Sequence, residues 1–549
     1  MSTTAPTGAP VNATWDELVT SALLGTDRRP LPRADGSAPT PAELLATAAV
    51  HTVRRRAALR PGAAAAEPLA PAPADPRPSL PAAARRRLAR LLADRSSPPN
   101  GRRGTAPDLT ELIPQWLASA SAHGYRAPAE LLPPLLDAAR ARTDLRPYVL
   151  PFAGPRGLWL AALNPEWRFA LRPSSRGAQR PDISDPEVVR VLWEEGLFAE
   201  RVALLGALRE RDPGEARSLL TSTWTTERAE DRLMFLDSLR SGLSHADEDF
   251  LEQALADRSR NVRATAAELL SALPGSRLAR RMAARAMSCV NPDRTEGAVS
   301  IAVEAPHECD PAMQRDGVVP APPQGRGERS WWLSQLVESA PLGIWRGRFD
   351  GRTAHELVSL PVADGWEGEL HAAWCRAAVR QSDGEWARAL LGTPSTPPAN
   401  GPGTASLAER SQLLAILPPA ERALWVADFI SAHGLSEAFQ LLGVCSVPWD
   451  GALGRAVVDA LDIARDAGSY PWSFSGVMGL AERCLNPAEA DRLAVLTTTP
   501  DEPADASPGA GGYWSEAFQR LVSTLRLRAE MEAELAGTQA EPAGEGAAR

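Results

Sequence analysis

The amino-acid sequence contains no lysine, so its 59 basic residues are all arginine. The nucleotide-binding loop GxxxxGK, followed by serine or threonine, places a lysine on the phosphates, and the absence of lysine therefore excludes it. The sequence also lacks GxSxG, the turn that presents the nucleophile of α/β-hydrolases. Abundant arginine, alanine, proline and glycine are typical of a GC-rich bacterial genome; selection for the planar fork of arginine is the alternative explanation.

Cysteine is sparse and scattered. The five residues form no closely spaced pair, and their number is odd: Cys289, Cys309, Cys375, Cys445 and Cys484. Disulfide frameworks and structural zinc sites usually show paired, short spacings. The pattern therefore predicts free thiols in a reducing compartment, and we expect a cytoplasmic protein.

Long apolar runs are missing as well. No stretch reaches the roughly 18 apolar residues that a membrane span needs. The N-terminal residues do not combine a basic segment with an apolar run, so no signal peptide is expected. Both observations predict a protein that does not enter a membrane.

The chain has 549 residues and a formal charge of −9. This length predicts several domains or a long repeat array. The acidic balance argues against a dedicated nucleic-acid-binding protein, although a local basic patch is compatible with it.

Short helices are predicted almost throughout. Near the N-terminus, Thr14 and Glu17 have the spacing of a capping box, and Gly25 is placed to end the helix. From residue 109 onward, apolar residues recur at helical spacing between Gly, Pro and Asp breaks. A last amphipathic helix begins near Tyr513 and is placed to cap the end of a helix stack.

The segment from Asp249 to Met282 shows the pattern most clearly. It divides at a turn over Asp257–Asn261 into two apolar helix faces. The residues predicted to face inward are Leu251, Ala254, Leu255, Val262, Ala266, Leu269, Leu270 and Leu273. "ALADRSRNVRATAAELLSAL" resembles the HEAT repeat, with matching residues at Asp257, Val262, Arg263, Ala266, Ala267 and Leu270. The resemblance implies an all-α fold, an irregular α-solenoid with HEAT-like helix pairs.

Breaks in composition divide the chain. Alternating residues in "TEGAVSIAVEAP" predict a short strand or hairpin inside a loop-rich central insertion. The expected parts are an N-terminal helical segment (1–60), a Pro/Ala/Arg-rich linker with a short helix (61–108), a helical subdomain (109–184), HEAT-like repeats (185–290), the insertion (291–330), C-terminal helical repeats (331–535) and a disordered tail (536–549).

The wider chain resembles an uncharacterised bacterial family of helical proteins, a domain of unknown function. The resemblance rests on "LVTSALLGTDRRP", "GLWLAALNPEWRF", "WEEGLFAERVALLGALRERDP" and the segment from Phe250 to Met282. It implies a gene neighbourhood with MoxR-type AAA+ ATPases, von Willebrand A-domain proteins and SWIM zinc-finger proteins, and hence a multiprotein system. It carries no functional residues with it.

Two groups of arginines are candidate contacts. Arg258, Arg260 and Arg263 surround the repeat turn, where they could bind phosphate or an acidic partner. The favoured interpretation is that Asp257 and Arg263 link successive repeats while the others are solvated. The second group is the candidate interaction surface, Arg277, Arg280, Arg281 and Arg285.

No metal site, catalytic residue or cofactor is predicted. His307 and Cys309 lie near Cys289, and His371 and Cys375 are four residues apart, but neither cluster has the spacing of a zinc site.

Tryptophan is conspicuous, with 16 residues. Several lie at predicted helix ends, namely Trp193, Trp331, Trp374, Trp386 and Trp425. Core anchoring is the default interpretation, and a peptide-binding groove is the alternative.

These features favour a non-enzymatic scaffold or adaptor that binds protein partners on a helical surface, with a MoxR-type ATPase or A-domain protein as the implied partner. The alternative is a HEAT-like nucleic-acid-binding or DNA-repair protein.

Overall fold

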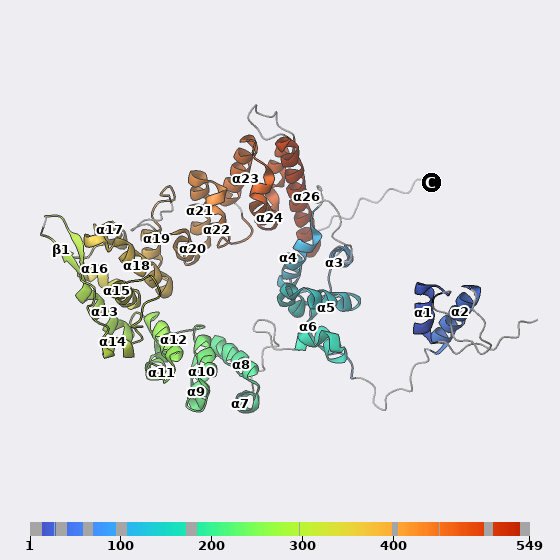
Figure 1. Ribbon diagram of the computed structural model, residues 1–549, viewed down its shortest axis with the longest axis horizontal. Coiled ribbons are helices and arrows are strands. Elements are labelled where there is room, and N and C mark those ends of the chain that lie inside the picture. The colour runs from blue at the N-terminus through green and yellow to red at the C-terminus, as the bar shows by residue number, and fades with distance from the viewer. Residues whose placement is uncertain are drawn as a thin grey trace, which may run out of the picture. The chain divides into compact units, whose positions relative to one another are not determined.

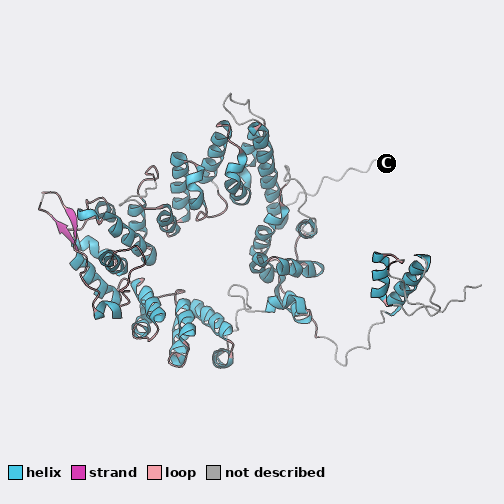
Figure 2. Cartoon of the chain, in the orientation of Figure 1, coloured by secondary structure: helices cyan, strands magenta, loops and turns pink. Residues whose placement is uncertain are grey.

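The computed structural model describes residues 14–26, 28, 41–58, 70–94, 107–171, 183, 185–295, 297–397, 405–449, 451–498 and 509–537. Residues 538–549, which belong to the tail that the sequence predicts to be disordered, lie outside this set. The protein is mostly helical, and the strands of the described residues form one two-stranded hairpin (Figure 2). None of the described helices is long and apolar enough to cross a membrane.

The chain divides into two compact units, residues 1–72 and 73–549. The first unit contains α1 (Trp15–Leu24) and α2 (Pro41–Ala58). The predicted capping box is confirmed, because Thr14 accepts from the Glu17 amide and Glu17 accepts from the Thr14 amide. Gly25 follows α1 with a φ of 86°, a conformation that glycine adopts without strain.

The second unit begins with a small helical core. Its helices are α3 (Ala82–Asp94), α4 (Leu109–Ala122), α5 (Leu132–Ala141) and α6 (Arg146–Leu163). Residues 73–94, within the segment predicted as a linker with a short helix, contribute to this core. Leu88 and Leu91 of α3 are fully buried, and Arg77 donates to the carbonyls of Pro151 and Phe152.

A run of short helices follows: α7 (Pro186–Glu195), α8 (Phe198–Arg211), α9 (Pro213–Thr223), α10 (Ala229–Ser238), α11 (Glu248–Ala254), α12 (Arg260–Ser271) and α13 (Arg277–Cys289). Helix α8 contacts α9 and α10, and α12 contacts α10 and α11. The inward-facing positions predicted between Leu251 and Leu273 are all buried, which confirms the helical register.

One helix in this run is shorter than the sequence indicates. Leu233, Leu236, Leu239 and Leu243 have the spacing of one helical face and indicate a helix over Arg228–Leu243, but α10 ends at Ser238. Arg209 holds the turn that follows this helix, because its guanidinium donates to the carbonyls of Leu239, Ser241 and Gly242. These carbonyls belong to a turn in which Gly242 has a φ of 63°.

The central insertion contains the predicted hairpin. Strand β1 (Val290–Asp293) pairs antiparallel with β2 (Ser300–Val303), with Val290 opposite Val303. Only β2 lies in the alternating segment, so the first strand was missed. A short helix, α14 (Pro311–Arg315), follows and ends at Asp316.

The remaining helices are α15 (Glu328–Ser339), α16 (Gly343–Arg348), α17 (Ala354–Val358), α18 (Glu367–Gln381), α19 (Gly384–Leu391), α20 (Leu407–Ala415), α21 (Pro419–His433), α22 (Leu435–Leu442), α23 (Gly451–Asp466), α24 (Ser475–Cys484), α25 (Ala490–Ala494) and α26 (Ala510–Ala536). The 3-10 turns between the elements are Ala129–Leu131, Thr143–Leu145, Pro165–Leu171, His245–Asp247, Ala363–Gly365, Pro471–Phe474, Pro487–Glu489 and Val495–Thr497.

Tryptophans anchor the core as predicted. Trp193, Trp374 and Trp386 are buried, and Trp331 and Trp425 are partly buried. Trp374 lies between Trp345 and Trp386, at ring-centroid distances of 6.0 and 5.1 Å.

Helix α26 joins two cores. Its first half buries Trp514, Phe518, Leu521 and Leu525 in the large core, as the predicted amphipathic face requires. Its second half packs Met531 and Leu535 against α3 and α4, which lie beside it in Figure 1. Arg87 of α3 also pairs with Glu530 and Glu534. The helix therefore does more than cover one end of a stack.

Candidate interaction surface

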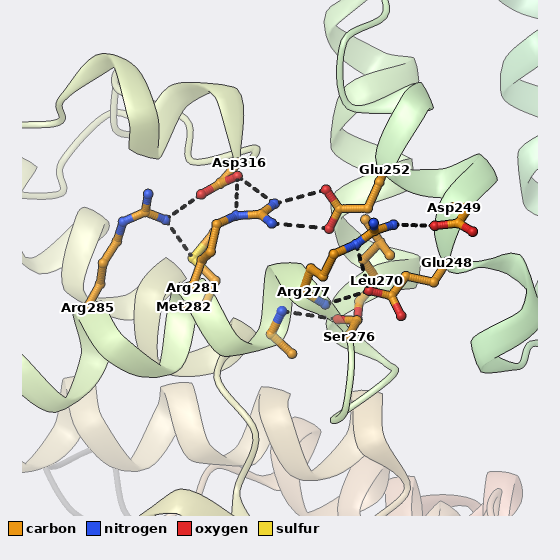
Figure 3. Close-up of polar contacts among 11 residues, drawn as sticks. Glu248, Asp249, Glu252, Leu270, Ser276, Arg277, Arg281, Met282, Arg285 and Asp316 are labelled. Carbon is orange, nitrogen blue, oxygen red and sulfur yellow. Dashed lines mark hydrogen bonds and ion pairs between the residues drawn. The ribbon is translucent and has the colours of Figure 1, made fainter.

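Helix α13 carries the four arginines of the predicted surface. Ser276 caps its N-terminus, accepting from the Ala279 amide at 3.0 Å and donating to the Leu270 carbonyl at 2.8 Å. One side of the helix is buried and consists of small or apolar residues: Leu278, Ala279, Met282, Ala283 and Ala286. The spacing i, i+4, i+8 places Arg277, Arg281 and Arg285 together on another side, as Figure 3 shows.

Arg277 connects α13 to α11. Its guanidinium lies 3.1 Å from a Glu248 carboxylate oxygen and 2.6 Å from one of Asp249. The Arg277 amide also donates to Glu248 at 2.7 Å. The Arg277 pKa is raised, chiefly by the hydrogen bond from its side chain to Asp249.

Arg281 and Arg285 share Asp316, the residue that ends α14. Arg281 contacts Asp316 at 2.8 Å and Glu252 of α11 at 3.2 Å (Figure 3). Arg285 contacts the other Asp316 oxygen at 2.6 Å. Because Asp316 is only 7% exposed, it is a buried link between the central insertion and α13.

Arg280 differs from its three neighbours. Its side chain is exposed, and among the residues that the structure describes it has no carboxylate partner. Three of the arginines therefore contact four carboxylates, Glu248, Asp249, Glu252 and Asp316, and with Arg280 included the formal charges of the group cancel. A paired surface of this kind attracts a polyanion weakly, since neutralised cations release few counterions from it.

The turn arginines are arranged differently from the prediction. Arg263 donates to the backbone carbonyls of Asp257 and Arg258 within its own turn, so the predicted link between repeats through Arg263 is wrong. Arg232 of α10 binds the Asp257 carboxylate instead, at 2.9 Å. Arg232, which the sequence analysis did not single out, thus links the turn to the preceding helix α10. Arg258 and Arg260 are exposed, in agreement with solvation.

A buried ion pair was also missed. Arg209 of α8 and Asp247, just before α11, contact at 2.9 Å with both side chains fully buried. Arg217 reaches the same carboxylate at 3.2 Å. The partners are 38 residues apart, and no local spacing marks either of them among the many charged residues.

The histidines and cysteines that the sequence brings close together lie in two separate places. Cys289 and His307 line one cavity of about 340 Å³ together with Glu304, but Cys309 is not part of its wall. His371 and Cys375 are both buried on α18, where His371 stacks on Trp374. Over the described ranges, no three His, Cys, Asp or Glu side chains are grouped so as to hold a metal ion.

The cysteines should differ in reactivity. Burial raises the pKa of the Cys375 thiol to about 12 and that of Cys445 to about 11. We expect iodoacetamide at pH 8 to modify the partly exposed Cys309 first and to leave Cys375 unmodified, because the thiolate is the reactive form. Peptide mass spectrometry after a short pulse measures this order, with labelling in urea as the control. Equal labelling of Cys309 and Cys375 in the folded protein would contradict it.

Asp316 should stabilise the packing of α13. We expect Asp316→Ala to lower the free energy of unfolding by about 1–2 kcal/mol, since it leaves two arginines without a shared acceptor. Arg281 retains Glu252, which limits the loss. Urea denaturation followed by circular dichroism measures the change. Arg280→Ala is the matched control and should leave the midpoint unchanged; equal effects of the two variants would refute the role of Asp316.

Fold and surface together define a mostly helical protein whose charged side chains pair across helices. A model of a family of unknown function, DUF5691, matches residues 17–535, and the chain therefore belongs to that family. No curated protein and no solved structure matched the chain.

Proposed function

We propose that this protein is a non-enzymatic scaffold or adaptor in the cytoplasm, an irregular α-solenoid of HEAT-like helix pairs that binds protein partners. The observation that carries the proposal is the order of helix contacts. Helix α8 contacts α10 and α10 contacts α12; α18 contacts α20 and α20 contacts α22. Contacts between alternate helices are expected when consecutive helix pairs stack, and such stacks present extended binding surfaces.

The charges of the α13 surface support a protein partner over a nucleic acid. Three of its arginines are already paired, and acidic and basic groups alternate along it. Mixed charge of this kind sets orientation and specificity in protein association. Arg280 remains available to an acidic group of the partner.

The partner proposed is a MoxR-type AAA+ ATPase or a von Willebrand A-domain protein, as the family resemblance implies. The test is affinity capture of the tagged full-length chain from its native cells, followed by mass spectrometry. We expect one of these two classes to be enriched, and Arg280→Glu to reduce its recovery. Arg258→Glu reverses a charge at the exposed turn and is the matched control. It should leave the recovery of the partner unchanged.

Two results would overturn the proposal. The first is a capture experiment in which the protein stays intact but neither an ATPase nor an A-domain protein is recovered with it. The other is binding to duplex DNA that weakens steeply between 50 and 200 mM salt, about 1000-fold or more for six or more phosphate contacts. That outcome would favour the nucleic-acid alternative.

A further inference from the structure

A cavity of about 310 Å³ lies between α4, the Val447–Pro448 loop and α26. This volume is at the lower end of the range of small-molecule sites, roughly 300–1,000 Å³. Its wall is mainly apolar and includes Leu112, Trp116, Met531 and Leu535. A wall of this composition suits a small ligand with an apolar body.

One cation lies in this apolar wall. Arg528 is 7% exposed, and burial lowers its pKa, although arginine stays protonated in proteins. Its Nη1 donates to the carbonyls of Glu482 and Leu485, at 3.2 and 2.7 Å. These carbonyls lie at the C-terminal end of α24, whose partial negative charge compensates the guanidinium only in part.

Among the described residues, only Nη1 of Arg528 has a hydrogen-bond acceptor. No described carboxylate forms an ion pair with this side chain, although Glu532 lies near enough to raise its pKa. The buried Arg209 differs from Arg528, because both of its terminal nitrogens donate to the Asp247 carboxylate. A buried guanidinium normally has such a carboxylate partner. Arg528 has no such partner among the residues that the structure describes, and its side chain lines the cavity.

A second donor on the same wall lacks an acceptor. The Trp116 side chain is 2% exposed, and its indole Nε1 makes no hydrogen bond with any described residue. Leaving a donor of this kind buried and unsatisfied costs about 1–3 kcal/mol. The cavity wall therefore carries these two sets of donors beside the polar side chains of Gln115, Ser119 and the exposed Glu532.

We infer that this cavity binds a small apolar monocarboxylate, with the carboxylate on the guanidinium of Arg528 and the apolar part against Trp116, Met531 and Leu535. Glu532 on the cavity wall disfavours a second negative charge on the ligand. The carboxylate can belong to a free organic acid or to the C-terminal residue of a peptide. The inference does not depend on the proposed adaptor function.

The test is calorimetric titration of the full chain with phenylacetate and with phenylacetamide, which has nearly the same shape without the charge. We expect phenylacetate to bind at least about tenfold more tightly, because charge-assisted hydrogen bonds are roughly twice as strong as neutral ones. Equal affinity for the two compounds, or no binding of phenylacetate, would overturn the inference.

A comparison of two peptides distinguishes the two sources of the carboxylate. Acetyl-Gly-Phe with a free C-terminus is compared with its C-terminal amide. Tighter binding of the free peptide than of phenylacetate assigns the site to a peptide C-terminus, and binding of phenylacetate alone assigns it to a free acid. Both results support a carboxylate site.

Two variants locate the site. Arg528→Met should abolish the preference for phenylacetate over phenylacetamide, but it also removes the contacts to α24. Ala118→Trp avoids this problem, because the exposed Ala118 lines the cavity without holding α24. It should reduce phenylacetate binding at least about tenfold by filling the cavity. Ala533→Trp, on an exposed position of α26 outside the wall, should bind like the unmodified protein. Unchanged binding by Ala118→Trp would show that the cavity is not the site.

Discussion

Asp247→Ala is expected to lower the free energy of unfolding by about 3–5 kcal/mol, the range observed when one partner of a buried ion pair is removed. The substitution leaves the fully buried guanidinium of Arg209 without its counter-charge. It also removes the acceptor of the Ser244 amide and of Arg217. Urea denaturation followed by circular dichroism measures the loss.

Two further variants separate charge from packing. Asp247→Asn keeps the side-chain volume and one acceptor. It should therefore lower the free energy of unfolding, but by less than Asp247→Ala does. Asp249→Ala removes a carboxylate that is 86% exposed and paired with Arg277, and it should leave the midpoint unchanged. If Asp247→Ala behaves like Asp249→Ala, the buried pair contributes little to stability.

The local features of the fold could be predicted from the sequence. Apolar spacing predicted the buried faces of α11 and α12, because helical periodicity is a property of neighbouring residues. The capping box of α1 was predicted for the same reason, since Thr14 and Glu17 are three residues apart.

Long-range partners could not be predicted. The Asp257 carboxylate binds Arg232 of the preceding α10, whereas Arg263 donates to the backbone carbonyl of Asp257. The turn after α10 likewise depends on a distant residue, since Arg209 of α8 binds its carbonyls. In a chain with 59 arginines, spacing alone does not select the partner of a given carboxylate.

The spacing of the α13 arginines could be predicted from the sequence, but their partners could not. The shared side of Arg277, Arg281 and Arg285 follows from their spacing, and the structure has them together. Their neutralisation was not foreseen, because Asp316 comes from a loop-rich insertion whose path has no periodic signal. A basic patch read from one helix therefore becomes a mixed surface once the neighbouring elements are in place.

Trp374→Ala should also cost about 3–5 kcal/mol, since the indole is fully buried and its loss leaves a large cavity. The ring contacts Trp345, Trp386 and His371, at centroid distances of 6.0, 5.1 and 5.6 Å. These neighbours belong to α16, α18 and α19, so the gap cannot close without moving whole helices. Thermal and urea unfolding measure the loss.

Trp472→Ala is the matched control for this substitution. Trp472 is 55% exposed and stacks on Tyr470 at 4.0 Å, so it loses less apolar burial on truncation. Trp374→Phe adds a graded test, because it keeps part of the ring and should lose less stability than Trp374→Ala. If Trp374→Ala is no more harmful than Trp472→Ala, helix α18 is not held in place by this aromatic cluster. If Trp374→Ala instead loses more stability than Trp374→Phe, the aromatic cluster holds α16, α18 and α19 together.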